Sequence, residues 1–215
     1  MASQRDTTSQ DILRAIQSTE TESKPLTGFK EKELRSSYGL CMDECYPGLY
    51  IGDIGAAKNK DFLKKVGITH VLNTAQGNNF AMVDTEADYY KDVGIQYLGL
   101  KLLDIASANI AQYFEDGARF IEDALSAGGK VLVHCFMGIS RSATISCAFL
   151  MLRRDMNAIE AITSLRKNRA IYPNDGFLSQ LADLDNKLRG INGWNYHKRW
   201  GEGPCRCPEG RRSKN

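Results

Sequence analysis

Along the middle of the chain, short apolar runs alternate with segments in which apolar residues recur at helical spacing. Short apolar runs occur in "GLYIGD", "ITHVLNT", "IQYLGLKLLD" and "KVLV", and glycine or polar residues bound each of them. Such runs are typical of buried strands. Helix-type spacing occurs between them, first in "NKDFLKKVG". The alternation predicts an α/β domain with a central, mostly parallel, twisted sheet flanked by helices.

Four longer helices are predicted from apolar residues spaced by three or four positions. The first follows the segment "IQYLGLKLLD" and ends at the glycines of "SAGG". The other three follow "KVLV", and the apolar stripe of the last one is typical of core packing. The residues that define these helices are Ile110, Phe114, Ala118, Ile121 and Leu125 for the first, Ile145, Ala148, Phe149 and Leu152 for the second, and the segments "NAIEAITSLRKNR" and "DGFLSQLADLDNKL" for the others.

Both ends of the chain differ from this central region. Residues 1–45 are rich in Ser, Thr, Glu and Lys, which predicts a mobile arm with one short amphipathic helix in "QDILRAIQ". Residues 191–215 combine basic residues with glycine and proline, which predicts a loosely ordered basic tail. We therefore expect a single domain over residues 46–190.

Charge and hydropathy exclude several classes of partner. The chain has 28 Lys and Arg against 26 Asp and Glu, a formal net charge of +2. Because no basic field covers the whole domain, no nucleic-acid partner is expected. The sequence contains no apolar run near 18 residues and no signal peptide, so we expect a cytoplasmic protein with no membrane partner. The basic tail could favour nuclear import, and the oligomeric state stays open.

The six cysteines are too scattered for a disulfide framework, so reduced thiols are expected. Four of them form a C-x3-C and a C-x-C pair near the two ends, with His197 nearby in sequence. These could in principle bind one zinc ion, but the spacings are poor, and no metal or other cofactor is expected. Cys147 falls within a predicted helix and is expected in the core. The two pairs are Cys41 with Cys45 and Cys205 with Cys207.

The strand "KVLV" leads into a turn, "HCFMGISRSA", that contains the candidate chemistry. Sites in parallel sheets lie beyond the carboxyl ends of strands, where the next helix presents free N–H groups. The backbone between Cys135 and Arg141 can form a cup of amides for the oxygens of a phosphate monoester, and the Arg141 guanidinium can close it. The residues of this predicted phosphate site are Phe136, Met137, Gly138, Ile139, Ser140 and Arg141.

The same amides and helix terminus predict a lowered pKa for Cys135, which would make it a thiolate nucleophile. Ser142 could donate a hydrogen bond to the sulfur, and His134 could support it from behind. An alkoxide or phenoxide leaving group needs a proton from an acid. Asp104, which ends "YLGLKLLD", is the candidate, and once ionised it could activate water. Plainer interpretations are a solvated loop carboxylate for Asp104 and an early-helix polar residue for Ser142.

The segment "VHCFMGISRSA" with the upstream Asp104 resembles the cysteine-dependent protein tyrosine phosphatases, specifically the small atypical dual-specificity phosphatases of the VHR-like group. Similar landmarks, such as "LYIGD" and "NRAIYPNDGFLSQL", extend the resemblance over roughly residues 46–189. It implies a single protein-tyrosine-phosphatase-like domain that hydrolyses phosphotyrosine, phosphoserine and phosphothreonine on proteins, MAP kinases among them. By the resemblance Cys135 is the nucleophile, Arg141 the phosphate clamp, Asp104 the general acid and Ser142 the thiolate-stabilising hydroxyl.

The resemblance also assigns substrate recognition to the N-terminal helix and to Arg169, although such an arginine more often complements the dipole at the end of a helix. Phe136 and Met137 are apolar where related loops often carry polar residues, so we expect a preference for apolar flanks. Two alternative functions stay open. One is a pseudophosphatase that binds phosphoproteins without turnover, which the complete set of reactive residues disfavours. The other is a lipid or RNA phosphatase, which the absence of basic residues between Cys135 and Arg141 disfavours.

Overall fold

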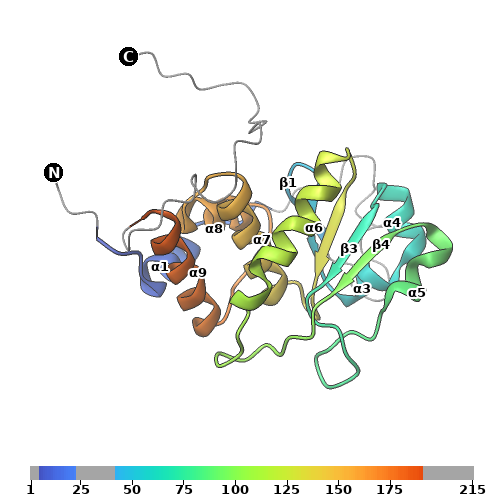
Figure 1. The fold of residues 1–215 in the computed structure, drawn as a ribbon, viewed down its shortest axis with the longest axis horizontal. Helices are drawn as coiled ribbons and strands as arrows, with labels where there is room; N and C mark the ends of the chain where they lie inside the picture. Colours follow the sequence, from blue (N-terminus) through green and yellow to red (C-terminus); the bar gives the residue numbers. More distant parts are fainter. Residues whose placement is uncertain (1–4, 23–41, 191–215) are drawn as a thin grey trace, which may run out of the picture.

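The computed structural model describes residues 5–22 and 42–190 (Figure 1). Its five-stranded sheet has the order β1-β2-β5-β3-β4. The pairing of β1 with β2 is antiparallel and the other three pairings are parallel. A mostly parallel sheet flanked by helices confirms the predicted fold class. The strands are β1 (Met42–Tyr46), β2 (Leu49–Gly52), β3 (His70–Asn73), β4 (Gln96–Gly99) and β5 (Val131–His134).

Strand β5 lies at the centre of the sheet, with β2 and β3 on either side. All four of its residues are buried, as expected for an apolar run that is covered on both faces. In register, its last residue His134 is level with Gly52 of β2 and Asn73 of β3. The carboxyl ends of these parallel strands therefore meet at one edge of the sheet, where Cys135 follows.

Alternate residues of the strands face two separate apolar clusters, one on each side of the sheet. Val131 and Val133 of β5 belong to the larger cluster, and Leu132 between them belongs to the smaller one. Figure 1 shows α1 and α6 to α9 on the larger side and α3, α4 and α5 on the other. The helices are α1 (Ser9–Ser18), α3 (Ile54–Lys58), α4 (Lys60–Val66), α5 (Ala87–Tyr90), α6 (Phe114–Ser126), α7 (Arg141–Arg153), α8 (Ala158–Arg166) and α9 (Asp175–Leu188), with short 3-10 turns at Lys91–Val93 and Ala111–Tyr113.

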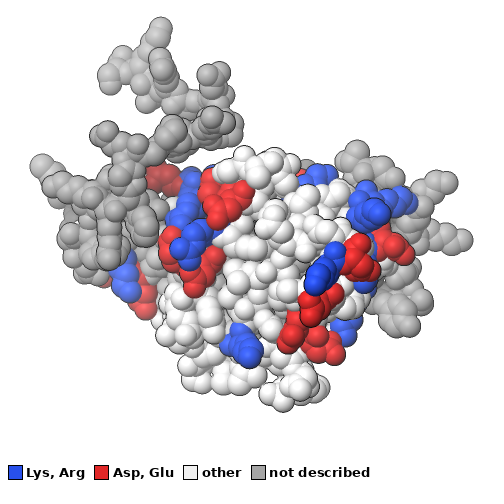
Figure 2. Space-filling view, turned by 45° about the vertical axis from the view of Figure 1, so that its right-hand side comes forward, with Lys and Arg blue, Asp and Glu red and all other residues white. Residues whose placement is uncertain are grey.

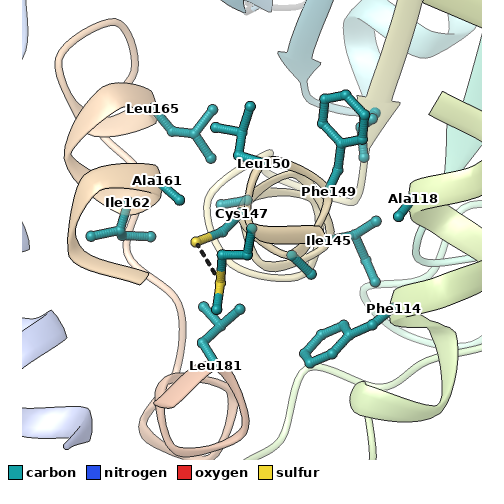
Figure 3. Close-up of a cluster of buried hydrophobic side chains, with 14 of the residues drawn as sticks. Phe114, Ala118, Ile145, Cys147, Phe149, Leu150, Ala161, Ile162, Leu165 and Leu181 are labelled. Atoms are coloured by element: carbon teal, nitrogen blue, oxygen red, sulfur yellow. Dashed lines mark hydrogen bonds between the residues drawn. The ribbon is translucent and has the colours of Figure 1, made fainter. Parts of the chain in front are cut away.

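Helix α7 is the centre of the larger cluster, and every residue from Arg141 to Leu152 is buried. Figure 3 shows its apolar side chains between those of α6, α8 and α9, including Phe114, Ala161 and Leu181. A helix that is buried all round cannot be amphipathic, and this explains why its sequence mixes small, apolar and hydroxyl residues without a polar face.

Strand β1 corrects the predicted start of the domain. Residues 42–45, which the sequence placed in the mobile arm, pair with β2 at the edge of the sheet, and Cys45 is buried there. Residues 1–4 and 23–41 of the predicted arm and the predicted tail, residues 191–215, lie outside the described residues.

The helix predicted in the arm forms as α1, and it packs on α8 and α9 (Figure 1). Its Ile12 and Ile16 are fully buried in the larger cluster. Just before it, the Thr7 hydroxyl donates to Asp185 Oδ2 at 2.5 Å, and the Thr7 backbone exchanges two hydrogen bonds with the Asn186 side chain. Asp185 also accepts from the amide of Ala158, which begins α8. This N-terminal segment is thus held by apolar and polar contacts together.

Charged side chains of both signs lie next to one another on the face shown in Figure 2. Most of them lie in two groups with a largely uncharged area between, so no patch of a single sign dominates this face. Ion pairs among the described residues include Lys60 with Asp92 and Arg154 with Glu122. Among the described helices, none combines the length and apolar character needed to cross a membrane.

Candidate active site

The loop between β5 and α7, residues 135–140, turns its carbonyl groups away from its interior. Four consecutive carbonyls accept hydrogen bonds from outside the loop, and two of these bonds come from one guanidinium. The bonds are Ile54 N to Phe136 O at 3.0 Å, Arg169 Nη2 to Met137 O at 3.1 Å, Arg169 Nε to Gly138 O at 2.7 Å and Tyr172 N to Ile139 O at 2.9 Å.

A trans peptide group points its N–H opposite to its C=O, and the described residues contain no cis peptide. The N–H groups of residues 137–140 therefore point to the interior of the loop. One of them, Gly138 N, donates to the Cys135 sulfur at 3.1 Å. Inward amides next to the N-terminus of α7 are an arrangement that suits a tetrahedral oxyanion, and the phosphate site stays a prediction.

Gly138 permits this path of the backbone. Its φ is +70°, in the left-handed region that residues with a Cβ rarely adopt. A Cβ at this position would also lie 2.4 Å from the carbonyl oxygen of Gly52 and 2.7 Å from Arg169 Nη2. Only glycine fits, because both the dihedral and the space exclude a side chain.

Cys135 lies at the bottom of this loop with 1% of its surface exposed. Burial alone would raise its pKa. The Ser142 hydroxyl, 3.4 Å from the sulfur, the charge of Arg141, and the amides of Ser142 and Gly138 act in the opposite direction. These donors outweigh burial and hold the pKa of the thiol below its ordinary value. The structure thus brings Ser142 to the sulfur.

His134 is fully buried, and its burial lowers its pKa to about 4. Its Nδ1 lies 3.2 Å from the carbonyl oxygen of Cys135. The ring is therefore neutral at physiological pH and contacts the backbone of the cysteine. Its contribution is to support the start of the loop rather than to supply charge.

Arg141 is 2% exposed and is held by the two loops that follow β3 and β4. Its Nη1 donates to Leu102 O at 3.1 Å, and its Nη2 donates to Ala81 O at 2.9 Å. Nη1 also lies 3.5 Å from the sulfur of Met82. These contacts fix the plane of the guanidinium at the mouth of the amide cup.

Asp104 lies beside this guanidinium. Its Oδ2 is 3.3 Å from Arg141 Nε, in an ion pair that lacks hydrogen-bond geometry. Its Oδ1 accepts from Ser140 Oγ at 2.7 Å and from Asn174 Nδ2 at 2.9 Å. Since β4 already ends at Gly99, Asp104 lies in an irregular segment and not at the end of a strand, which corrects the expected length of that strand. The structure nevertheless brings the carboxyl to the same edge as Cys135.

Asn174 was not recognised from the sequence as part of the site. Its Oδ1 accepts from Phe177 N at 3.0 Å and so caps α9, which leaves its Nδ2 available for Asp104. The available signal was the pattern of an N-cap residue at the start of a predicted helix. That signal identifies the cap, but it does not show that the cap residue contacts Asp104.

Arg169 fits neither of its two expected roles. It is 5% exposed, pairs with Asp43 of β1 at 2.6 Å and donates to the carbonyls of Met137 and Gly138. It is therefore neither a solvated charge at a helix end nor an exposed recognition group. Its contacts make it a positioning residue for the loop.

No group of three or more His, Cys, Asp or Glu side chains suited to a metal occurs within residues 5–22 and 42–190. Of the four cysteines considered for zinc, Cys45 is buried in the sheet, and Cys41, Cys205 and Cys207 lie outside those ranges. The described part of the site uses amides, a guanidinium and a thiol.

Comparisons with known proteins agree with this geometry. The family model described as "Dual specificity phosphatase, catalytic domain" matches residues 49–187. Human dual specificity protein phosphatase 13B is 46% identical over 148 residues, which cover 68% of this chain and 74% of that protein. The crystal structure of human DUSP28 has a TM-score of 0.60 and 26% identity over 69% of this chain and 95% of its own. The crystal structure of DUSP15 has a TM-score of 0.56 and 31% identity, and the match covers 75% of this chain and 98% of that one.

Proposed function

Because the chain belongs to the dual-specificity phosphatase family, as an atypical member of the protein tyrosine phosphatase superfamily, we propose that it hydrolyses phosphotyrosine and phosphoserine or phosphothreonine on proteins through a cysteinyl-phosphate intermediate. Membership makes it a cysteine-dependent protein phosphatase. The observation that supports the proposed mechanism is the buried Cys135 thiol with a lowered pKa, facing a loop whose amides point inward.

In the first step the Cys135 thiolate attacks phosphorus, so an S–P bond forms while the P–O bond to the substrate breaks. The inward amides of residues 137–140 receive the non-bridging oxygens. A guanidinium has about five N–H donors. Arg141 donates one N–H to the carbonyl of Leu102 and one to that of Ala81, so further N–H groups remain for the phosphoryl oxygens. The positive charge and fixed direction of the guanidinium stabilise the negative charge that develops in the transition state.

Asp104 supplies the proton that the leaving alkoxide or phenoxide requires. Ser140 and Asn174 hold its Oδ1, which leaves Oδ2 beside the guanidinium that clamps the phosphate. In the second step the ionised carboxylate accepts a proton from water. The water oxygen attacks phosphorus, the S–P bond breaks, and inorganic phosphate leaves. Ser142 stabilises the departing thiolate through its hydrogen bond to the sulfur.

The substrates we propose are phosphorylated signalling proteins of the cytoplasm, and MAP kinases, which the family resemblance suggests, are compared with other phosphoproteins in the test. The test measures hydrolysis of an aryl phosphate and of phosphotyrosine and phosphothreonine peptides, followed by detection of phosphate on Cys135 after rapid acid quenching. Turnover with a covalent phosphocysteine is the expected result. Tight binding of phosphopeptides without turnover at any pH between about 5 and 8 would instead favour the phosphoprotein-binding module.

A further inference from the structure

Exposed apolar side chains are concentrated around the phosphate loop. Within the described residues, seven large hydrophobic side chains are exposed, and six of them lie on loops next to Cys135, Asp104 or Arg141. The seventh, Ile159, lies on α8. An exposed apolar cluster of this kind marks an interaction site. The six residues, here named the apolar rim, are Phe80, Leu103, Ile105, Phe136, Met137 and Tyr172.

Hydrogen bonds made by the rim residues or by their direct neighbours hold the loops of the apolar rim in place. Phe80 precedes Ala81, and Leu103 follows Leu102, the two residues whose carbonyls bind the Arg141 guanidinium. Ile105 follows the fixed Asp104, and Phe136 and Met137 follow Cys135 directly. The amide of Tyr172 donates to Ile139 O in the phosphate loop. The rim is therefore a preformed surface around the entrance to the amide cup, and Phe80 is its most exposed member at 97%.

The loops that carry the rim offer almost no positive charge at their surface. Residues 76–84, 100–110, 135–140 and 170–176 contain a single Lys or Arg, Lys101. The same segments contain three carboxylates, those of Asp84, Asp104 and Asp175. The guanidinium of Arg169 is buried behind the loop and paired with Asp43. An acidic residue or a second phosphate beside the bound one would meet carboxylates and apolar groups.

We propose that the apolar rim selects substrates in which a single phosphorylated residue is flanked by large apolar side chains, and that it disfavours acidic flanks and a neighbouring second phosphate. This inference rests on the proposed phosphatase function. Partial burial of one leucine-sized side chain against the rim corresponds to about tenfold in kcat/KM. A polypeptide is favoured over an anionic membrane, because attraction to anionic lipids requires several surface Lys or Arg residues and these loops have one.

The test compares kcat/KM for phosphotyrosine peptides of one length whose flanking positions are leucine and isoleucine, serine, or aspartate and glutamate, together with a doubly phosphorylated peptide and a small aryl phosphate. The expected order of kcat/KM is apolar, then neutral, then acidic and doubly phosphorylated, with about a tenfold difference between the extremes.

Equal values of kcat/KM, or a preference for acidic or doubly phosphorylated peptides, would overturn the inference while aryl phosphate hydrolysis still supported the phosphatase. Faster hydrolysis of a phosphoinositide in vesicles than of the apolar peptide would also overturn it. No hydrolysis of any substrate would overturn both proposals.

Two matched variants test the location of the effect. Phe80→Ser should reduce the ratio of kcat/KM for apolar over acidic peptides at least about threefold, whereas Ile159→Ser, which removes the exposed apolar side chain on α8, should leave the ratio unchanged. A ratio cancels any general loss of activity in a variant. The rim would not select the substrate if the double variant Phe80→Ser/Leu103→Ser kept the ratio of the unmodified protein. The same conclusion would follow if Ile159→Ser changed the ratio as much as Phe80→Ser does.

Discussion

Cys135 and Cys147 are both fully buried, yet their pKa values shift in opposite directions. Burial raises the pKa of Cys147, and the carboxylate of Asp185 adds to this effect. The sulfur of Cys147 contacts that of Met151 at 4.0 Å in the apolar cluster (Figure 3). At Cys135, burial is opposed by a hydroxyl, a guanidinium and two amides, and the pKa falls. Burial by itself makes a thiol inert, and the donors around the sulfur make it a nucleophile.

The same contrast extends along α7. Its first turn buries polar groups, Arg141 and Ser142, and each has hydrogen-bond partners in the loops or at the sulfur. Apart from the hydroxyl of Ser146, its later turns bury apolar groups against α6, α8 and α9. A substitution in the first turn leaves a buried polar group without its hydrogen-bond partner, whereas a substitution by a smaller residue in the later turns leaves a cavity. The first turn should therefore control turnover, and the later turns should control stability.

The largest effect expected from this comparison is that of exchanging the reactive sulfur. Cys135→Ser should reduce kcat by about 10⁴-fold or more, because a hydroxyl with these neighbours is not ionised. Cys147→Ala should retain turnover within about twofold and lose about 1 kcal/mol of stability to a small cavity. Steady-state hydrolysis of an aryl phosphate and thermal unfolding measure the two effects. Loss of turnover in Cys147→Ala at a temperature where it is folded would contradict the comparison.

The next effect concerns the carboxyl group of Asp104, which lies beside the Arg141 guanidinium. Asp104→Asn should lower kcat about 10²-fold to 10³-fold with substrate binding retained, because the amide cannot protonate the leaving group. A poor leaving group needs the proton more than a good one does, so the loss should be larger for an alkyl phosphate than for a nitrophenyl phosphate. Asp175→Asn, which changes an exposed carboxyl at the start of α9, is the control that should leave the ratio of the two rates unchanged. An equal loss for both esters in Asp104→Asn would assign the acid to another residue.

A smaller effect is expected from the hydroxyl at the sulfur. Ser142→Ala removes a donor to the thiolate, so the pKa of Cys135 should rise and kcat should fall about tenfold. Because the thiolate is the reactive form, alkylation by iodoacetamide increases as pH rises through this pKa, and the curve should move to higher pH in the variant. Ser146→Ala is the matched control one turn further along α7, since its buried hydroxyl has no hydrogen-bond partner among the described residues. Identical alkylation curves for Ser142→Ala and the unmodified protein would remove Ser142 from the mechanism.

The smallest effect is expected from the support behind the phosphate loop. Asp43→Asn weakens the ion pair that orients Arg169, and a slight displacement of the loop should lower kcat/KM about threefold. The inhibition constant of inorganic phosphate should rise in parallel, because the same loop carbonyls and amides are affected. Asp92→Asn, which breaks the ion pair with Lys60 away from the phosphate loop, should change neither quantity. A change in stability without any change in phosphate inhibition would mean that Asp43 only supports the fold.

The sequence was sufficient to predict most of the sheet, because β2, β3 and β5 are apolar runs that are buried in the structure. The reactive loop could be identified for a related reason, since Cys135, Arg141 and Ser142 are neighbours along the chain. Strand β1 was not predicted, because an edge strand is half exposed and its "MDECY" resembles a polar arm. Its burial pattern depends on β2 and α8, which a local reading of the sequence does not include.

The residues that hold the site from a distance could not be predicted in the same way. Arg169 reaches Met137 and Asp43, and Asn174 reaches Asp104, across long separations in sequence. Periodicity reports which face of an element is buried, but it does not report which side chain bonds to which loop. For this reason the sequence was sufficient to propose the chemistry of the site, whereas the residues that position it required the structure.

The docking of α1 has a practical consequence for how the catalytic unit is delimited. The family match begins at residue 49, so a boundary drawn there would remove both α1 and β1. Such a truncated protein would expose apolar surface on α8 and α9 and leave Arg169 without the Asp43 carboxylate. We therefore expect a stable catalytic unit to include Thr7, α1 and β1, and shorter fragments should be compared with it for solubility before any kinetic difference is interpreted.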